Sequence, residues 1–554
     1  MTVQTARNGS AVHGAELETY LRSVERLLRS SDMDGALLLA HEACCKGHEH
    51  AHLLTLAAHE ALRRGEPDSA LAFALRARAL APRNVDVLNI VGVAQAARGQ
   101  QRAAIPAFDA ALRQSPTAYM VRFNKAAALE DLQDLERARV EFERVLDTQP
   151  DHAESLARLA TLAAQRGDAK SARQYAERAL KANPRQPGAP LALAMADLED
   201  GRYEAVLTRM APLTGTDNSN PTNRAIAQGL TGDALDALGR TDEAFVAYSA
   251  SKATERARHK PAFETPQWET AAALVERLNG FFREAPPADW RADPNFGGDD
   301  IAGTHVFVVG FPRSGTTMIE QILAGHPDIE AMGERSCLMP AQDSFTVPLD
   351  GLAKLAALSH RDLGPWRDTY WKQVSEEGFS PRRKVFVDKM PLYSVFLCLI
   401  AKLFPRAKIL FAVRDPRDVV LSCFRRRFVM TQQMYELTAL ESAASYYDQV
   451  MRLRERYREV LGLTFCDVRH ENMVGDFDRE TRRICDFLGV EWNAGLREFA
   501  RSVPARSVNT PSGPQLARGL FTQGVGHWRR YAPQLAPVLP QLAPWAERFG
   551  YARE

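Results

Sequence analysis

The chain of 554 residues has few of the features that mark secreted, membrane-spanning or metal-binding proteins. Its seven cysteines form no Cys-x-x-Cys pair and show no metal-ligand spacing, so we expect no metal site. Residues 1–13 lack the basic-then-apolar pattern of a secretory signal. The most apolar later stretch, Tyr393–Phe404, contains Lys402 and is too short to span a bilayer. We therefore expect a protein of the reducing cytoplasm, and the abundance of Ala and Arg is typical of bacterial proteins.

The chain also lacks an excess of charge of either sign. Its 70 basic and 69 acidic residues leave a formal net charge of +1, so no overall field would attract nucleic acid or a membrane surface. Any site for an anion must therefore be local. The length is too great for one hydrophobic core and predicts about three or four domain-sized units.

The N-terminal half contains a repeat with a period of 34 residues. Three sets of small or helix-ending residues recur at this step: Pro82, Pro116, Pro150 and Pro184; Ala70, Ala104, Ala138 and Ala172; and Gly65, Gly99, Gln133, Gly167 and Gly201. A helix–turn–helix unit explains each set, because Gly ends the first helix, Ala allows close helix packing and Pro ends the second helix.

This pattern resembles the tetratricopeptide repeat and predicts an all-α solenoid over residues 17–258, after an N-terminal extension at 1–16. The resemblance implies a groove that binds a protein or peptide partner. The alternative is a rigid spacer, or a surface that only packs against the C-terminal half.

The C-terminal half is predicted to be an α/β domain over residues 304–554, after a connecting segment at 259–303 that is rich in Pro, Gly and Asp. Short β-rich runs alternate with helical patterns, which predicts a parallel sheet with crossover helices. The runs are 305–309, 384–387, 408–413 and 463–468. Polar residues follow each run, and ligands bind such sheets at the carboxyl ends of the strands, so we expect one shared site there.

The first run leads into Gly310-Phe311-Pro312-Arg313-Ser314-Gly315-Thr316-Thr317 and then a helical pattern. A strand, a Gly-bearing loop and a helix start form an anion cradle, because backbone N–H groups converge there. The spacing almost matches the triphosphate-binding loop, but Thr316 stands where that loop has its Lys. We therefore expect a phosphate site that is not built for ATP hydrolysis, with its positive charge supplied by Arg313.

Three blocks resemble the sulfotransferases that use 3′-phosphoadenosine 5′-phosphosulfate, and the nearest match is the tyrosylprotein sulfotransferase type. They are residues 313–334, 388–391 and 413–422. The resemblance covers about residues 304–551. It implies a P-loop-like fold and a loop of Pro312, Arg313, Ser314, Gly315, Thr316 and Thr317 that grips the 5′-phosphosulfate.

Further roles are implied by the same resemblance. Glu334 takes the place of the general base, Lys389 lies near the bridging oxygen of the leaving phosphate, and Arg414 and Ser422 bind the 3′-phosphate. Arg426 lies one helical turn beyond Ser422 on the same face, whereas Arg425 and Arg427 diverge toward solvent or substrate.

The C-terminal part of the resemblance is looser. Ser512 takes the place of a Ser whose hydroxyl approaches the leaving phosphate, and Arg529 is a possible phosphate contact. His470 stands where Tyr is usual, and residues 517–519 replace the usual basic-x-Pro arrangement. Both departures are expected either to loosen the binding of the nucleotide or to mark a different subfamily.

Several alternatives stay open. His326 is a second candidate base, although His-Pro after a helix more often closes a turn. The leading function is sulfuryl transfer without a metal to a hydroxyl acceptor. A protein or peptide tyrosine is the first acceptor class, and a carbohydrate or small hydroxyl compound is the second. A kinase, disfavoured by the missing Lys, and a non-catalytic repeat scaffold are the other classes.

Overall fold

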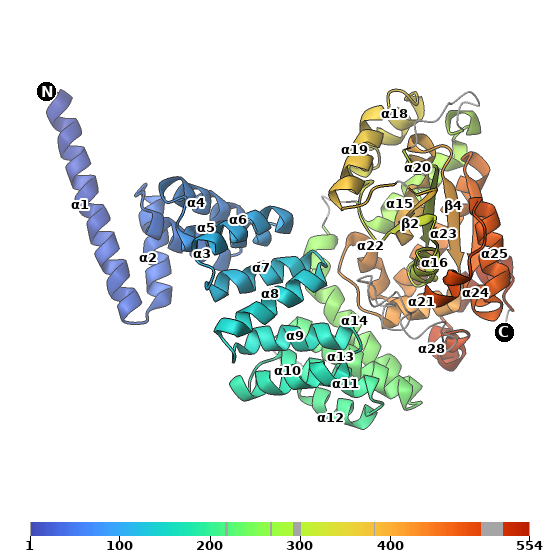
Figure 1. The fold of residues 1–554 in the computed structure, drawn as a ribbon, viewed down its shortest axis with the longest axis horizontal. Coiled ribbons are helices and arrows are strands. Elements are labelled where there is room, and N and C mark those ends of the chain that lie inside the picture. Colours follow the sequence, from blue (N-terminus) through green and yellow to red (C-terminus); the bar gives the residue numbers. More distant parts are fainter. Residues whose placement is uncertain are drawn as a thin grey trace. The chain divides into compact units, whose positions relative to one another are not determined.

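A computed structural model describes residues 2–215, 220–265, 269–291, 301–381, 383–499 and 524–552 (Figure 1). The contacts divide the chain into two compact units. The first unit comprises Met1–Ala164 and Asp168–Leu193, and the second comprises Gln165–Gly167 and Ala194–Glu554. Within the described ranges, no helix is both long enough and apolar enough to cross a membrane.

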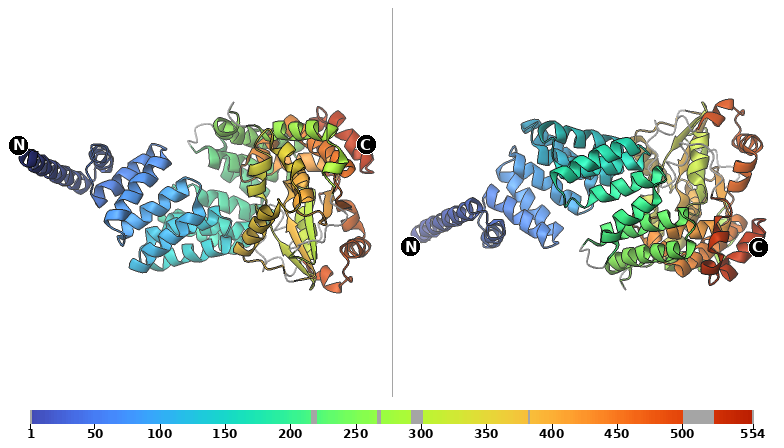
Figure 2. Two further views of the ribbon diagram at one scale, coloured as in Figure 1. Left: turned by 90° about the horizontal axis from the view of Figure 1, so that it is seen from above. Right: turned by 90° about the horizontal axis from the view of Figure 1, so that it is seen from below.

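The first unit is built from paired helices, as the 34-residue period predicts (Figure 2). They are α1 (Thr2–Arg29), α2 (Met33–Cys45), α3 (Ala51–Arg63), α4 (Pro67–Leu80), α5 (Val85–Ala97), α6 (Gln101–Gln114), α7 (Tyr119–Asp131), α8 (Leu135–Thr148), α9 (Ala153–Gln165), α10 (Ala169–Ala182) and the start of α11 (Gly188–Glu199).

Each of the three periodic sets has the structural role that the sequence predicts. The turn residues Gly65, Gly99, Gln133, Gly167 and Gly201 all have left-handed backbones, with φ between 60° and 76°. Even Gln133 adopts this conformation, although a side chain makes it unfavourable. The four periodic alanines are all 0% exposed. Each periodic proline stands two residues after the end of a helix, so the helical repeat is confirmed.

The second unit begins with further helices. After α11 come α12 (Tyr203–Thr214), α13 (Pro221–Ala237), α14 (Thr241–Phe263) and α15 (Ala271–Glu284). Leu235 of α13 and Tyr248 of α14 belong to the same hydrophobic core as the sheet described below. Gly232 allows this packing, because a Cβ there would lie 2.5 Å from the Tyr248 ring. The last helix pair, α13 and α14, is therefore part of the same folded body as the α/β domain.

The centre of the second unit is a five-stranded parallel sheet in the order β2-β3-β1-β4-β5. The strands are β1 (Thr304–Gly310), β2 (Ile329–Met332), β3 (Val385–Lys389), β4 (Lys408–Val413) and β5 (Thr464–Arg469). Four of them coincide with the predicted runs. Strand β2 was not predicted, because a strand of four residues with the sequence Ile-Glu-Ala-Met is too short and too mixed to show a pattern.

Helices cover both faces of the sheet. On one face Val306 and Val308 of β1 pack with α16 (Thr316–Leu323), α24 (His470–Gly475) and α25 (Phe477–Leu488). On the other face Phe307 and Val309 pack with α19 (Gly364–Glu376), α20 (Leu397–Leu403), α21 (Pro416–Arg425) and α23 (Leu440–Val460). Burial on both faces explains why the strand residues are almost continuously apolar.

Shorter elements complete the unit. They are η1 (Pro287–Asp289), α17 (Met339–Phe345), α18 (Gly351–Ala357), η2 (Pro391–Phe396), α22 (Gln432–Tyr435), η3 (Glu436–Thr438), η4 (Ala494–Glu498), η5 (His527–Tyr531), α28 (Ala532–Leu535) and α29 (Leu539–Arg548). Because all five strands run in one direction, β1, β3 and β4 bring the polar residues at their carboxyl ends to one edge of the sheet.

Candidate active site at the carboxyl ends of the strands

The segment Pro312-Arg313-Ser314-Gly315-Thr316-Thr317 forms a tight loop and the first turn of α16. Arg313 and Gly315 have φ values of 70° and 106°, so the chain reverses sharply before the helix begins. The Oγ of Ser314 donates to the carbonyl of Phe311 at 2.7 Å and closes the turn from inside. The free N–H groups at the start of α16 and the positive end of its dipole therefore favour an anion at this loop.

His470, at the start of α24, lies against this loop. A Cβ at Gly315 would lie 3.2 Å from its Nδ1, so glycine is the residue that leaves room for the ring. Burial, together with the charges of Arg414 and Arg313, lowers the pKa of His470 to about 3. The imidazole is therefore uncharged at neutral pH, like the Tyr that the resemblance leads one to expect at this position.

Four guanidinium groups gather beside the loop. Arg313 Nε donates to Ser422 Oγ at 3.1 Å, and Arg414 Nη1 lies 3.4 Å from the carbonyl of Arg313. Burial, and then the charges of Arg426, Arg414 and Arg425, lower the pKa of Arg313 to about 9. The group that should carry the charge of the loop is thus repelled by its neighbours, and an anion bound among them would relieve that repulsion.

The residues present fit a phosphate better than a metal ion. The Nε of Arg414 is buried and has no hydrogen-bond partner among the described residues, so an acceptor oxygen would satisfy it. Within the same residues, no group of three or more His, Cys, Asp or Glu side chains is placed to hold a metal. An anionic ligand such as a phosphate therefore suits the chemistry of this cluster.

Glu334 and Lys389, which are 55 positions apart in the sequence, form an ion pair at the same edge of the sheet. Glu334 follows β2 and Lys389 ends β3, and Lys389 Nζ lies 2.6 Å from Glu334 Oε1. The Lys389 side chain is only 1% exposed, whereas that of Glu334 is 39% exposed. A buried cation thus meets a carboxylate that is open to solvent and to an incoming substrate.

A third charged residue, Glu320, joins this pair and was missed by sequence reasoning. Its Oε2 lies 3.1 Å from Lys389 Nζ, and its side chain is 7% exposed. Burial by itself lowers the pKa of Lys389, but the charges of Glu320 and Glu334 outweigh it and raise that pKa. The signal was an acidic residue among the apolar positions Met318, Ile319, Ile322 and Leu323 of α16, where a buried charge needs a partner.

Asp388, next to Lys389, turns to the opposite face of the sheet and is fully buried. Tyr370 Oη donates to its Oδ2 at 2.8 Å, and Tyr370 Oη lies 3.1 Å from His305 Nε2. Burial raises the pKa of Asp388 to about 7, against the lowering effects of Tyr370 and Lys389. These hydrogen bonds fix the end of β3 on the face opposite Lys389.

Two of the three consecutive arginines at the end of α21 are not placed as the sequence suggested. Helix α21 ends at Arg425, and Arg426 has an extended backbone, with Nη1 donating to Asp233 at 3.2 Å. Arg426 still acts on Arg313 through its charge. The expectation that Arg425 and Arg427 diverge toward solvent or substrate is wrong. They bind acidic side chains of α13 and α14, which lie beside the end of α21.

Asp236 of α13 is the centre of these contacts. It accepts hydrogen bonds from Arg425 at 2.5 Å and from Tyr531 at 2.7 Å, and Arg530 Nη1 lies 3.3 Å away. His527 Nε2 lies 3.4 Å from the same carboxylate. One side chain of the last helix pair therefore holds both the end of α21, which carries Ser422, and the segment 527–531.

Like Asp236, Asp418 of α21 also binds the segment that contains Arg529. The carboxylate of Asp418 accepts the backbone N–H of Gly526 at 2.7 Å and that of Trp528 at 2.8 Å. Arg529 itself lies in η5, with its guanidinium 5.2 Å from the centre of the Trp528 ring. Ser512 lies outside the described residues. The roles predicted for Arg529 and Ser512 stay predictions.

His326 has the structural role that the sequence favoured. Its Nδ1 accepts the backbone N–H of Asp328 at 3.1 Å, and its Nε2 lies 2.7 Å from the carbonyl of Glu491. The ring is buried and closes the turn between α16 and β2. Both nitrogens are occupied, so His326 is not placed to act as a base.

We expect Asp236→Ala to lower the free energy of unfolding by about 1–3 kcal/mol, because Arg425 and Tyr531 lose their acceptor in a largely buried place. Urea unfolding followed by circular dichroism measures this change. Glu243→Ala is the matched control, since Glu243 pairs with Arg240 at the exposed surface of α14. That change should lie within about 0.5 kcal/mol. Equal stability of the two variants would show that the cluster contributes nothing.

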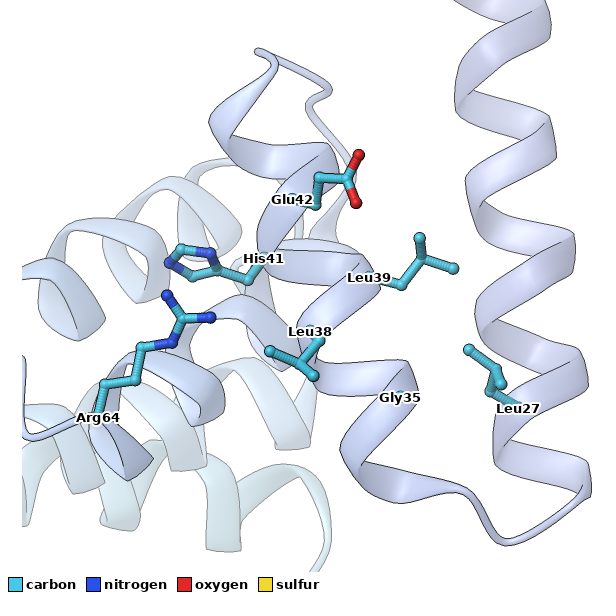
Figure 3. A pocket seen from close by; sticks show the side chains of 7 residues that line it. All are labelled: Leu27, Gly35, Leu38, Leu39, His41, Glu42 and Arg64. Atoms are coloured by element: carbon cyan, nitrogen blue, oxygen red, sulfur yellow. The ribbon is translucent and has the colours of Figure 1, made fainter.

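A separate hollow lies among the first three helices, distant in sequence from these residues (Figure 3). It has a volume of about 530 Å³ and is open to solvent. Leu27 of α1 and Leu39 of α2 point toward each other, while His41 and Arg64 lie together at another side. It holds no cluster of catalytic groups comparable to that of the sheet edge.

Comparisons with known proteins match both halves of the chain. Residues 305–494 match the family model described as the Sulfotransferase family, and residues 55–119 and 123–190 match the Tetratricopeptide repeat. Among solved structures, the sulfotransferase domain from the Synechococcus PCC 7002 olefin synthase is 22% identical, with a TM-score of 0.35. That match covers 46% of this chain and 98% of the other.

Relatives by sequence are distant. A protein-tyrosine sulfotransferase of Drosophila melanogaster is 24% identical over 266 residues, which cover 44% of this chain and 51% of the fly protein. Omega-hydroxy-beta-dihydromenaquinone-9 sulfotransferase Stf3 of Mycobacterium bovis is 24% identical over 252 residues, 34% of this chain and 64% of that protein. The chain spans about half to two thirds of the length of these two relatives. It carries tetratricopeptide repeats followed by a sulfotransferase-family domain.

Proposed function

We propose that this protein transfers a sulfuryl group from 3′-phosphoadenosine 5′-phosphosulfate to a hydroxyl acceptor. One observation carries the proposal: a phosphate loop that lacks the triphosphate Lys and is surrounded by arginines shares the sheet edge with the Glu334–Lys389 pair. A donor with a single 5′-phosphate bearing sulfate needs no triphosphate grip. The match to the sulfotransferase family supports the same conclusion.

The loop from Pro312 to Thr317 would hold the 5′-phosphosulfate, and Arg414 and Ser422 would hold the 3′-phosphate, with Arg426 and Arg529 as further phosphate contacts. In this structure Ser422 is hydrogen-bonded to Arg313, which joins the two proposed phosphate sites. We expect donor binding to break the hydrogen bond between Arg313 and Ser422, because each phosphate of the donor offers these two side chains a charged acceptor.

The donor supplies an activated sulfuryl group with a phosphate that can leave. Glu334 accepts the proton of the acceptor hydroxyl as the new S–O bond forms. The old S–O bond breaks and its electron pair stays on the phosphate, where Lys389 and Arg313 stabilise the charge. Ser512 is assigned the same task at the leaving phosphate. No covalent intermediate with the protein is needed.

A protein or peptide tyrosine is the acceptor we propose first, because the repeats suit extended chains and several relatives are named protein-tyrosine sulfotransferases. A carbohydrate or small hydroxyl compound is the second candidate. The mycobacterial relative, which is named a dihydromenaquinone sulfotransferase, keeps this class open. The free thiols of all seven cysteines support the cytoplasmic location that we propose.

We expect purified protein to transfer ³⁵S-sulfate from the labelled donor to at least one member of a panel of tyrosine peptides, glycans and small hydroxyl compounds. Labelled products separated by chromatography identify the acceptor class. ATP hydrolysis should stay at the background level, because Thr316 replaces the Lys of the triphosphate loop. Turnover of ATP would favour a kinase, and tight peptide binding without transfer to any acceptor would favour a non-catalytic scaffold.

A further inference from the structure

Lys389 has two carboxylate partners, and they differ in exposure. Glu334 Oε1 lies 2.6 Å and Glu320 Oε2 lies 3.1 Å from its Nζ. Glu320 is only 7% exposed, whereas Glu334 is 39% exposed. The buried partner belongs to α16, the helix that begins in the phosphate loop, and the exposed partner belongs to the segment after β2.

The buried carboxylate is fixed on both of its oxygens. Gln321 Nε2 donates to Glu320 Oε1 at 3.2 Å, which leaves Oε2 for Lys389. Glu334 has no comparable burial, although the segment that follows it is anchored by the Tyr393 hydroxyl, which contacts Arg335 O at 3.0 Å and Leu338 N at 3.2 Å. Glu320 is therefore held in a fixed position beside Lys389. Glu334 precedes the anchored segment of backbone, but its side chain is open to solvent.

The proposed reaction needs Lys389 to exchange one of these partners. A Glu334 carboxylate that is bonded to an ammonium is a weaker base, so it must release Lys389 to take a proton. A fully buried lysine left without a carboxylate would tend to lose its charge, because burial disfavours the ammonium form. A cation that must contact the leaving phosphate therefore requires a second, permanent counter-charge.

We propose that Glu320 is a positioning residue that holds Lys389 charged and in place while Lys389 exchanges its contact with Glu334 for one with the donor phosphate. The inference rests on the proposed function and extends it to Glu320, a residue of α16. It also explains why α16 carries one charged residue that is almost fully buried. The ion pair between Glu320 and Lys389 connects α16, which begins in the phosphate loop, to the end of β3.

The other titratable groups near Lys389 do not replace Glu320. Asp388 adjoins it in β3 but turns its carboxylate to the opposite face, toward Tyr370. Glu334 and Glu320 are the groups whose charges raise the pKa of Lys389 against the effect of burial. Removing the charge of Glu320 therefore leaves the ammonium dependent on Glu334, the same carboxylate that the reaction needs.

The test is Glu320→Gln in the full chain. With ε-¹³C-lysine labelling, the Lys389 signal, assigned from Lys389→Arg, should titrate at a pH about one unit or more below that of the wild type. The ratio of variant to wild-type kcat should be below about one tenth and should fall further as pH rises, since the variant loses its ammonium at lower pH. Binding of adenosine 3′,5′-bisphosphate should change less than threefold, by about 0.6 kcal/mol at most.

Glu320→Asp, which keeps the charge, should restore the pH dependence, and Glu376→Gln on the exposed surface of α19 is the matched control. An unchanged lysine titration would overturn the proposal, as would an equal loss in Glu320→Asp and Glu320→Gln. The titration needs no turnover. If the wild type transfers no sulfate, the proposed function fails while the role of Glu320 in holding the charge of Lys389 is still decided.

Discussion

Glu334→Gln should reduce sulfuryl transfer by about 10²–10⁴-fold while the protein still binds the nucleotide. The amide has the size of the carboxylate and can still accept a hydrogen bond from Lys389, but it cannot take a proton from the acceptor hydroxyl. Lys389 keeps its buried partner Glu320, so its charge and place are retained. Initial rates of ³⁵S transfer measure the loss, and calorimetric titration with adenosine 3′,5′-bisphosphate measures binding.

Two comparisons make this result specific. Glu334→Ala should be equally inactive and should also bind nucleotide, because Glu334 lies on the exposed side of Lys389. Glu376→Gln, at the surface of α19, should leave the rate unchanged. Transfer by Glu334→Gln within threefold of the wild type would remove Glu334 as the base. The ion pair with Lys389 would then be a purely structural contact.

Arg313→Gly should have opposite effects on stability and on activity. Arg313 has a left-handed backbone, with φ of 70°, and stands among three other guanidinium groups that lower its pKa. Glycine adopts this backbone without steric cost and removes the repulsion, so the protein without ligand should be about 1 kcal/mol more stable. Transfer should fall by about 10²–10³-fold, because a charge that stabilises the transferring group is lost.

Gln133→Gly separates the contribution of the left-handed backbone from that of the charge repulsion at Arg313. Gln133 has φ of 60° in a turn of the repeats, so glycine there relieves a similar backbone strain without changing the candidate site. It should be slightly more stable than the wild type and fully active. Urea unfolding and the ³⁵S assay measure both variants. A loss of stability in Arg313→Gly larger than about 1 kcal/mol would show that Arg313 is a structural residue of the loop, not a strained ligand group.

Much of the fold could be predicted from local patterns. The left-handed turns of the repeats follow from Gly at a fixed step, and Gln133 stands in the same register with φ of 60°. Four strands were found because both faces are buried and their residues are continuously apolar. Strand β2 was missed since its pairing with β3 determines its structure, and four residues carry no pattern of their own.

The candidate site was predicted in part, for a related reason. Arg313, Arg414 and Lys389 each follow a strand, and parallel strands deliver such residues to one edge. Glu320 could not be placed, because a helix pattern does not reveal which buried position faces a lysine of another strand. Arg425 was misjudged because its partner, Asp236, is 189 residues away in a helix that the sequence assigned to the repeats.

By itself, the sequence determined the helical repeats, the parallel α/β domain and the loop that has Thr316 at the position of the triphosphate lysine and Arg313 within it. These follow from periodicity, from strand burial and from backbone geometry, which act over a few residues to a few tens of residues. Only the tertiary structure decided that Lys389 is held between Glu320 and Glu334, and that α13 and α14 hold the arginines of α21. Those contacts join segments far apart in the chain, and ion pairs between such segments leave no periodic signal.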